Sequence, residues 1–365
     1  MKKSQWLMLV AILGPLAIIC RWLGLSPLLT FACSAGALVP LGALMEESTD
    51  ELAERLGPTI GGLLNATLGN APELIIACMA LSKGLQDVVK ASIAGSILGN
   101  LLFANGLAMA IGGWGRPCQR FCHESAGLNS GLLYLAVVAL IVPAMFEHTT
   151  SGGVDAVSMA VAAHADDVKL EGISFQVATV LIIVYVISLA YVITKPAVPA
   201  RKSGSEAENV EHASGGLMKP LMTLLVVTLG VAFMSEILTD AIGPTASSLG
   251  LTTTFTGVFL LASAGNLAQT YNAVQFARDD NMELTLATTV GSSTQVALLV
   301  APVLVFVSIA LGHPMNLVFS QLELFGLLVA TVAVRNTTGD GISNWMEGVL
   351  LVGVYALLGI AFFAA

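Results

Sequence analysis

The first feature of this sequence that could do chemistry is a carboxylate inside an apolar run of membrane-spanning length. In LLNATLGNAPELIIACM, residues 63–79, Glu73 follows Asn70 by three positions, so both side-chain oxygens would lie on one face of a helix. Pro72 removes a backbone N–H and disturbs the helix, which would free a carbonyl oxygen nearby. A carboxylate at this depth is costly unless it is protonated, paired, or facing water or a cation. We therefore predict a cation and proton site at Glu73.

A second stretch repeats this spacing with different side chains. The segment GNAPELIIA at 69–77 aligns with GNLAQTYNA at 265–273. A Gly-Ser pair follows the first glycine of each segment by 26 residues, at 95–96 and at 291–292. The offset between the two copies is 196 residues in both places. We therefore expect the chain to contain two copies of one structural unit.

Hard oxygen donors dominate the polar side chains of these segments. Carboxylate, amide and hydroxyl oxygens suit Ca²⁺, whereas the thiolate and imidazole ligands that copper and zinc prefer are missing from the equivalent positions. Small polar residues also join helices within membranes, so helix packing remains an alternative role for the Gly-Ser pairs. The candidate cation ligands are Glu73, Asn70, Asn266, Gln269, Ser96, Ser292 and Gln295.

The composition places these residues in a polytopic membrane protein. Of 365 residues, 56% are hydrophobic and 11% are charged, and the mean hydropathy is +0.84, far from the values of soluble proteins. The apolar runs are long enough to cross about 30 Å of hydrocarbon. The eleven predicted spans are 6–21, 28–45, 60–81, 91–113, 128–146, 175–193, 217–238, 255–277, 284–311, 317–334 and 345–363.

Loop charges and one long polar segment organise these spans. Lys and Arg concentrate in alternate loops in a way that predicts a cytoplasmic N-terminus and an external C-terminus. The segment 195–219, rich in Pro, Gly, Ser and charge, is typical of a cytoplasmic linker. Five spans lie on each side of it once the first span is set aside. An odd number of spans gives the two halves opposite orientations in the bilayer.

The sequence therefore predicts an all-α polytopic membrane protein with about 11 transmembrane helices, arranged as a 5+5 inverted repeat after an extra N-terminal helix. The first span follows Lys2 and Lys3 as a signal peptide would, but no small-x-small cleavage site follows it, so we interpret it as an anchored helix. The expected parts are an N-terminal helix at 1–27, a first transmembrane repeat at 28–194, a cytoplasmic linker at 195–216 and a second transmembrane repeat at 217–365.

Other functional classes have little support in the sequence. A net charge of −9 without clustered Lys and Arg argues against nucleic acid as a partner. The five cysteines form no disulfide framework. Cys118, Cys122 and His123 lack the second ligand pair of a typical zinc site, so their role stays open. Because no Walker-type loop, nucleophile elbow or zinc-protease motif occurs, we expect no enzyme and no cofactor beyond transported ions.

Three stretches together carry a family resemblance: EESTDELAERLGPTIGGLLNATLGNAPELI at 46–75, SIAGSILGNLLFANGLA at 92–108 and NTTGDGISNWMEGVLL at 336–351. Over nearly its whole length, the chain resembles the Ca²⁺/H⁺ exchanger family of the cation/calcium antiporter superfamily. The resemblance implies eleven spans with a linker after the sixth. It also implies two glutamates, one in each repeat, that either bind one Ca²⁺ or take up protons. Glu73, in its Gly-Asn-x-x-Glu motif, matches the first of them.

The second of these glutamates is missing. Where the family has Gly-Asn-x-x-Glu-His, this chain has Gln269 followed by Thr270. An amide oxygen can coordinate Ca²⁺ but neutralises no charge, so we expect weaker Ca²⁺ binding. A single titrating glutamate would also make the exchange of one Ca²⁺ for one H⁺ electrogenic unless another acid joins. Glu47 and Glu236, at the ends of the preceding spans, are candidates along the access path, and simple solvation is the alternative for both.

The leading hypothesis is a secondary active antiporter that exchanges Ca²⁺ or a related cation for H⁺, with Glu73 alternating between cation coordination and protonation. Because of Gln269, an exchanger of altered ion selectivity or electrogenic coupling is the first alternative. A non-transporting relative of the family is the second. The predicted partners are cations, protons and the lipid bilayer. We expect the membrane to be a prokaryotic plasma membrane, because the loops are short and no targeting extension is evident.

Overall fold

Helices form nearly all of the computed structural model, which describes residues 3–150, 159–194 and 217–365. The elements of the first half are α1 (Lys3–Trp22), α2 (Pro27–Leu56), α3 (Pro58–Leu68), α4 (Ala71–Ser82), α5 (Gln86–Leu98), the π-helical η1 (Gly99–Ala104), α6 (Asn105–Gly112), β1 (Gln119–Arg120), α7 (His123–Thr150) and α8 (Met159–Thr194). Those of the second half are α9 (Met218–Leu249), α10 (Thr253–Phe255), η2 (Thr256–Leu261), α11 (Ala262–Arg278), α12 (Met282–Leu286), η3 (Ala287–Gly291), α13 (Ser292–Gln295), η4 (Val296–Val300), α14 (Ala301–Ala310), α15 (Gln321–Thr338), β2 (Ile342–Ser343) and α16 (Trp345–Ala364).

Within the described residues, nine helices are long and apolar enough to cross a membrane. Their bounds are Gln5–Trp22, Pro27–Leu56, Ile60–Ser82, Gln86–Gly112, His123–Phe146, Lys169–Thr194, Met218–Leu249, Met282–Ala310 and Trp345–Ala364. Two of the eleven predicted spans, 255–277 and 317–334, lie in helices outside this set. Polar side chains account for the difference, because α11 carries several amides and α15 carries a carboxylate in its first turn and a guanidinium in its last.

The helix that carries Glu73 is interrupted just before it. α3 ends at Leu68 and α4 begins at Ala71, with Asn70 in the N-cap position. Pro72 lies in the first turn of α4, where its missing N–H removes no helical hydrogen bond. Glu73 follows in the same turn, where the helix dipole favours a negative charge. The break thus places the carboxylate at a helix N-terminus within a membrane-spanning segment.

The corresponding region of the second half has no such break. α10, η2 and α11 follow one another directly from Thr253 to Arg278. The two helices that contain the Gly-Ser pairs also include π-helical turns, η1 after α5 and η3 and η4 on either side of α13. Such turns occur often at functional sites in membrane and soluble proteins. The site region therefore combines one helix break with several local changes of helical pitch.

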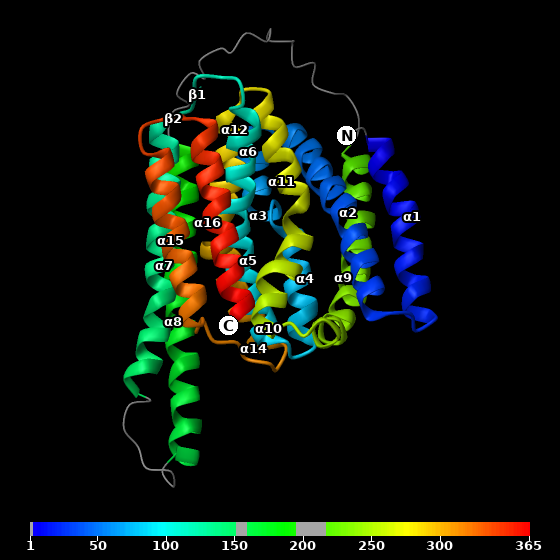
Figure 1. The fold of residues 1–365 in the computed structure, drawn as a ribbon, viewed down its shortest axis with the longest axis vertical. Coiled ribbons are helices and arrows are strands. Elements are labelled where there is room, and N and C mark those ends of the chain that lie inside the picture. Colours follow the sequence, from blue (N-terminus) through cyan, green and yellow to red (C-terminus); the bar gives the residue numbers. More distant parts are fainter. Residues whose placement is uncertain (1–2, 151–158, 195–216) are drawn as a thin grey trace.

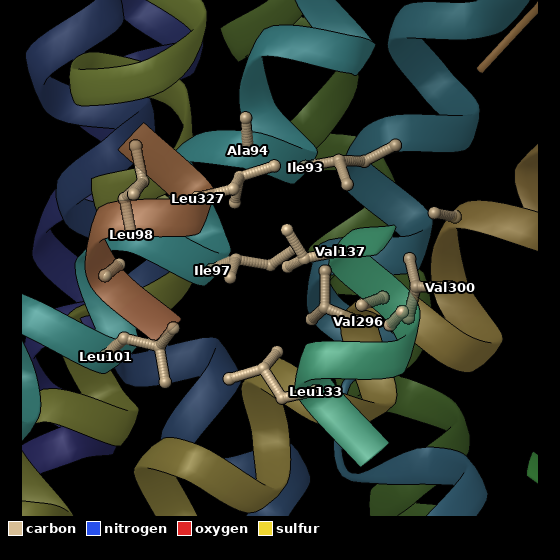
Figure 2. Packing of buried hydrophobic residues seen from close by; sticks show 14 of the residues in the cluster. Ile93, Ala94, Ile97, Leu98, Leu101, Leu133, Val137, Val296, Val300 and Leu327 are labelled. Atoms are coloured by element: carbon tan, nitrogen blue, oxygen red, sulfur yellow. The ribbon is translucent and has the colours of Figure 1, made fainter. Parts of the chain in front are cut away.

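One apolar cluster holds α5, α7, η4 and α15 together. Ile97, Val137, Val296 and Leu327 are almost completely inaccessible to solvent, and Figure 2 shows these side chains filling the space between their helices. Burial of branched aliphatic side chains removes apolar surface from water and lipid contact and fixes helix positions by close packing. This first cluster forms the larger part of the protein interior.

A second apolar cluster joins α1, α2 and α9, which lie together on one side of the bundle, away from α7, α8 and α15 (Figure 1). Its buried members include Leu38 of α2 and Val231 of α9. α4 and α11 contribute to both clusters: Ile76 and Ala268 belong to the second, whereas Ala77 and Ala273 belong to the first. These two helices, which carry Glu73 and Gln269, therefore run along the boundary between the clusters.

α1 begins near one end of the bundle and α16 finishes at the opposite end (Figure 1). A two-stranded sheet, β1 with β2 antiparallel, adds a small feature that the all-α prediction lacks. Gln119 pairs with Ser343 and Arg120 with Ile342, which ties the segment before α7 to the segment before α16. Strands of two residues give no recognisable pattern in a sequence.

Candidate cation site

Matched pairs of amide and hydroxyl side chains connect the two halves of the chain. Ser96 of α5 donates to Asn266 Oδ1 of α11 at 2.8 Å, and Ser292 of α13 donates to Asn70 Oδ1 before α4 at 2.5 Å. The two serines are 196 positions apart, and so are the two asparagines. All four residues are buried, with exposed fractions of 7% or less. Each Gly-Ser helix therefore binds the asparagine of the other half.

Further hydrogen bonds orient these amides. Asn70 Nδ2 donates to Gln295 Oε1 at 2.6 Å, and Asn266 Nδ2 donates to the Ser96 carbonyl at 3.1 Å. A side-chain carbonyl oxygen has two lone pairs, so an Oδ1 that accepts one hydroxyl proton keeps a second lone pair for a cation. The predicted ligands thus form two hydrogen-bonded groups, Asn70 with Ser292 and Gln295, and Asn266 with Ser96.

Gln269 joins the group of Asn70 and Ser292, and its side-chain oxygen and nitrogen both have hydrogen-bond partners. Its Oε1 lies 3.1 Å from the donor Asn100 Nδ2 and 3.2 Å from the Ser292 hydroxyl. Its Nε2 donates to the Gly69 carbonyl at 3.4 Å. The side chain is buried. In this conformation Gln269 connects α11 to η1, α13 and the break before α4, so its predicted role as a cation ligand would require some of these bonds to open.

Glu73 contrasts with Gln269, because its Oε2 is buried and has no hydrogen-bond partner among the described residues. Its side chain packs on α11 at Gly265, where an added Cβ would lie 3.3 Å from Glu73 Cγ. Asn100 Oδ1 is a second buried oxygen without a partner in the described part of the chain. Buried polar atoms without partners are rare in folded proteins and call for a proton, an ion or water. Among the candidate ligands, Glu73 is therefore the carboxylate with an oxygen available for a proton or a cation.

Glu46 of α2 is a neighbour of Glu73 that the sequence analysis did not select. Asn272 Nδ2 of α11 donates to Glu46 Oε2 at 2.7 Å. The Glu46 carboxylate also interacts electrostatically with Glu73 and with Asp50 on its own helix. The helical spacing of the sequence could have indicated Glu46, because it follows the buried Gly42 by four residues and so lies on the same face of α2.

The two predicted access-path residues lie in different surroundings. Glu47, the neighbour of Glu46, is exposed on α2. Glu236 of α9 accepts from Arg21 at 3.3 Å, and Arg21 also pairs with Asp240 at 2.8 Å. Lys83, at the end of α4, pairs with Asp240 at 2.6 Å. Glu236 thus belongs to a partly exposed ion-pair network that joins the ends of α1, α4 and α9.

The cysteine and histidine cluster before α7 shows no metal-binding geometry in the described residues, where no group of three or more His, Cys, Asp or Glu could hold an ion. Cys122 is exposed, and its backbone N–H donates to Glu283 at 2.8 Å. Cys118 is partly buried. The hydrogen bond to Glu283 gives this segment a structural connection to the start of α12.

Long apolar helices, one of them broken before a buried carboxylate, and serine–asparagine bonds between the two parts of the chain define a helical membrane protein with a polar candidate site in its interior. The comparison with family models agrees. The model described as sodium/calcium exchanger protein matches residues 26–194 and 219–364. The chain belongs to this sodium/calcium exchanger protein family.

Individual relatives are similar along almost the whole chain. The Ca²⁺/H⁺ antiporter of Synechocystis sp. is 40% identical over 375 aligned residues, which cover 99% of this chain and 98% of the relative. The Ca²⁺/H⁺ antiporter ChaA of Bacillus subtilis is 35% identical and covers 97% of each chain. The solved structure of native YfkE, a Ca²⁺/H⁺ antiporter protein, is 34% identical with a TM-score of 0.80 and covers 99% of this chain and 100% of YfkE.

Proposed function

We propose that this chain is a secondary active antiporter that exchanges Ca²⁺ for H⁺ across a membrane. The observation that carries the proposal is the buried Oε2 of Glu73, which has no hydrogen-bond partner among the described residues, on a side chain packed against Gly265 of α11. Relatives that are named Ca²⁺/H⁺ antiporters and match nearly the whole chain support the choice of ions. Either Ca²⁺ or a proton satisfies this carboxylate, so the two ions compete for one place and their fluxes become coupled.

The ligands that we propose for the cation are Glu73 with the free lone pairs of the Asn70 and Asn266 carbonyl oxygens. Ser96, Ser292 and Gln295 hold these amides in place and present further oxygens. Ca²⁺ accepts six to eight oxygen ligands, which include amide carbonyls and waters, so a site with few charged ligands is chemically suitable. Neutral amides would leave most of the charge compensation to carboxylates.

We further propose that the chain works as an inverted repeat, with the repeats at 28–194 and 217–365. The reciprocal serine–asparagine bonds support this layout, since both partners of each bond are displaced by the same 196 positions. The two separate ranges of the family match are also consistent with it. Rocking of the α1, α2 and α9 cluster against the rest of the bundle would then alternate access to the site from the two sides.

The proposed location is a prokaryotic plasma membrane with a cytoplasmic N-terminus and an external C-terminus. Arg21 and Lys83, which the loop charges assign to the outside, meet at Asp240. Arg116 donates to the carbonyl of Arg278, and both of these residues are assigned to the cytoplasm. As a transporter that uses an ion gradient, the protein would need neither enzymatic activity nor a resident cofactor.

A second candidate function is exchange of another cation for protons. Gln269 favours it, because the position that would carry a second carboxylate provides only a neutral amide, and a monovalent cation needs less charge compensation than Ca²⁺. Competition separates the two functions. An excess of a monovalent cation would suppress Ca²⁺ flux only weakly in the first case and strongly in the second.

The test of the proposed function is proton movement in sealed proteoliposomes after addition of Ca²⁺ outside, followed with a pH-sensitive dye under a potassium clamp. We expect Ca²⁺ to drive proton release in the wild type and Glu73→Gln to abolish it. Glu171→Gln, which removes an exposed glutamate of α8, is the matched control and should leave the signal unchanged. No Ca²⁺-dependent proton movement in the wild type would reject Ca²⁺/H⁺ exchange.

A further inference from the structure

We propose that Glu46 is a second carboxylate ligand of the transported cation and supplies the negative charge that Gln269 lacks. The inference rests on the proposed function, since it concerns the same site. It starts from the position of α2 rather than from any similarity between sequences. A carboxylate absent from one helix is replaced here by one on a helix packed against it.

Close packing around Gly42 brings this part of α2 to the site. An added Cβ at Gly42 would lie 3.9 Å from the Pro72 side chain of α4 and 3.9 Å from the Ala268 Cβ of α11. α2 therefore passes between the residue before Glu73 and the residue before Gln269. Glu46 is one helical turn further along α2, at the spacing that keeps it on the same face as Gly42.

Both carboxylates contact α11. Glu73 packs on Gly265, and Asn272 donates to Glu46 at 2.7 Å. Gly265, Ala268 and Asn272 are spaced i, i+3 and i+7, which places them along one face of α11. Glu46 from α2 and Glu73 from α4 thus both contact this part of α11, with Asn272 positioning the first.

The charges around Glu46 favour a bound cation. The charged groups that interact with Glu46 are Glu73 from α4 and Asp50 from its own helix, and α11 contributes the neutral Asn272. The ion pairs among the described residues use other acids and involve neither Glu46 nor Glu73. Two neighbouring carboxylates without a basic partner repel, and a divalent cation bound by both reverses the sign of that interaction.

The arrangement explains how a chain with Gln269 can retain a site for a divalent ion. Glu73 alone would leave a net charge of about +1 on bound Ca²⁺, whereas Glu73 with Glu46 matches the charge of the ion. The amide at Gln269 then keeps its structural hydrogen bonds to Asn100 and Gly69 while the ion binds between Glu73 and Glu46. The cation site is displaced toward α2.

The experiment measures the Ca²⁺ concentration for half-maximal uptake of radioactive Ca²⁺ into proteoliposomes with an imposed proton gradient. We expect Glu46→Gln to raise this concentration by about tenfold, because ligand charge sets Ca²⁺ affinity. The matched control is Glu54→Gln, which removes an exposed glutamate from the same helix and should change it by less than about twofold. In the double variant Glu46→Gln with Gln269→Glu, a carboxylate returns on α11 and the half-saturation concentration should fall back toward the wild-type value.

The outcomes separate this inference from the proposed function. If the wild type transports Ca²⁺ and Glu46→Gln behaves as Glu54→Gln does, Glu46 is not a ligand and the inference is overturned, while Ca²⁺ transport stands. If the wild type carries no Ca²⁺, the proposed function itself fails.

A second variant covers the case in which Glu46→Gln does not reconstitute. Asn272→Ala keeps both carboxylates but removes the hydrogen bond that positions Glu46. We expect it to raise the half-saturation concentration by about threefold, because one positioning hydrogen bond is lost. An unchanged value in Asn272→Ala would overturn the inference as well.

Discussion

Positions 73 and 269 are equivalent in the two halves of the chain, yet their surroundings differ completely. Gln269 has a donor at its oxygen, Asn100 Nδ2, and an acceptor at its nitrogen, the Gly69 carbonyl. Glu73 Oε2 has no partner among the described residues. The position equivalent to Asn100, 196 residues later, is the buried Val296, which offers no side-chain donor.

The two halves therefore differ at groups of contacting positions and not at single positions. The amide at 269 in the second half is bound by an amide at 100 in the first half. The carboxylate at 73 in the first half has no such counterpart, because position 296 of the second half carries an aliphatic side chain. One position therefore fastens helices together, and the other keeps an oxygen available for an ion. Substitutions at positions 73, 100 and 269 test this difference between the two positions.

The largest effect is expected for Glu73→Gln. Loss of the carboxylate removes both the charge for Ca²⁺ and the proton carrier, so the initial rate of Ca²⁺ uptake should fall by about a hundredfold or more. Gln269→Ala, at the equivalent position, should retain measurable uptake. Radioactive Ca²⁺ uptake into proteoliposomes compares the two variants. Equal losses of uptake in both would show that positions 73 and 269 do not differ in their role.

Gln269→Glu would sharpen the comparison by placing carboxylates at both equivalent positions. The added charge should strengthen Ca²⁺ binding by about tenfold, although the new carboxylate would face the Gly69 carbonyl that now accepts from the amide. Isothermal titration calorimetry of the purified variant measures the affinity. Weaker binding than in the wild type would mean that the amide contact at Gly69 matters more than the charge.

Acidic pH should weaken apparent Ca²⁺ affinity, since protons and Ca²⁺ compete for Glu73. The sign follows from the charge of the group: lowering the pH on the side where Ca²⁺ binds fills the carboxylate with protons and raises the Ca²⁺ concentration for half-maximal uptake. Uptake measured over a series of external pH values, with the internal pH fixed, checks this. A half-saturation concentration independent of pH would argue against a shared carboxylate.

Asn100→Val should reduce stability more than Ca²⁺ affinity. The substitution gives position 100 the side chain found at 296 and leaves the Gln269 oxygen with only the Ser292 hydroxyl. A buried polar group that loses a partner costs about 1–3 kcal/mol, so the thermal unfolding temperature in detergent should fall. An unchanged unfolding temperature would show that the Asn100–Gln269 bond does not fasten the halves.

The smallest effect is expected for Asp240→Asn, which weakens the ion pairs with Arg21 and Lys83. These groups are partly exposed, and surface ion pairs contribute about 0–1 kcal/mol. The Ca²⁺ affinity should stay unchanged, and the transport rate should shift by less than about threefold, since the network joins α9 to α1 and α4. A large change in affinity would place the network in the ion path.

Much of this architecture could be predicted from the sequence, because apolar length and polar punctuation mark helices in a membrane. The constant offset predicted two copies of one unit, although the hydrogen bonds between them did not follow from it. Of the eleven predicted spans, 255–277 and 317–334 lie in helices outside the nine that are apolar enough to cross a membrane, so the number of spans stays a prediction. Several polar residues of α11 are buried in the bundle, and a sequence does not tell which faces of a helix are covered.

The acids on α2 illustrate a finer limit. The sequence favoured Glu47, whereas Glu46 is the residue that contacts α11. A step of one residue turns a helical side chain by about 100°, so choosing between adjacent glutamates requires the packing partner of the helix. The same holds for Gln269, whose hydrogen-bond partners come from three other helical segments. Such contacts depend on tertiary structure alone.

The central claim is that Glu73 is the open cation ligand and Gln269 a structural fastening. Calorimetric titration of Ca²⁺ into purified wild type, Glu73→Gln and Gln269→Ala, all shown to be monodisperse, tests it without any transport step. We expect heat of Ca²⁺ binding in the wild type and in Gln269→Ala and none in Glu73→Gln. Ca²⁺ binding that survives in Glu73→Gln and disappears in Gln269→Ala would contradict it.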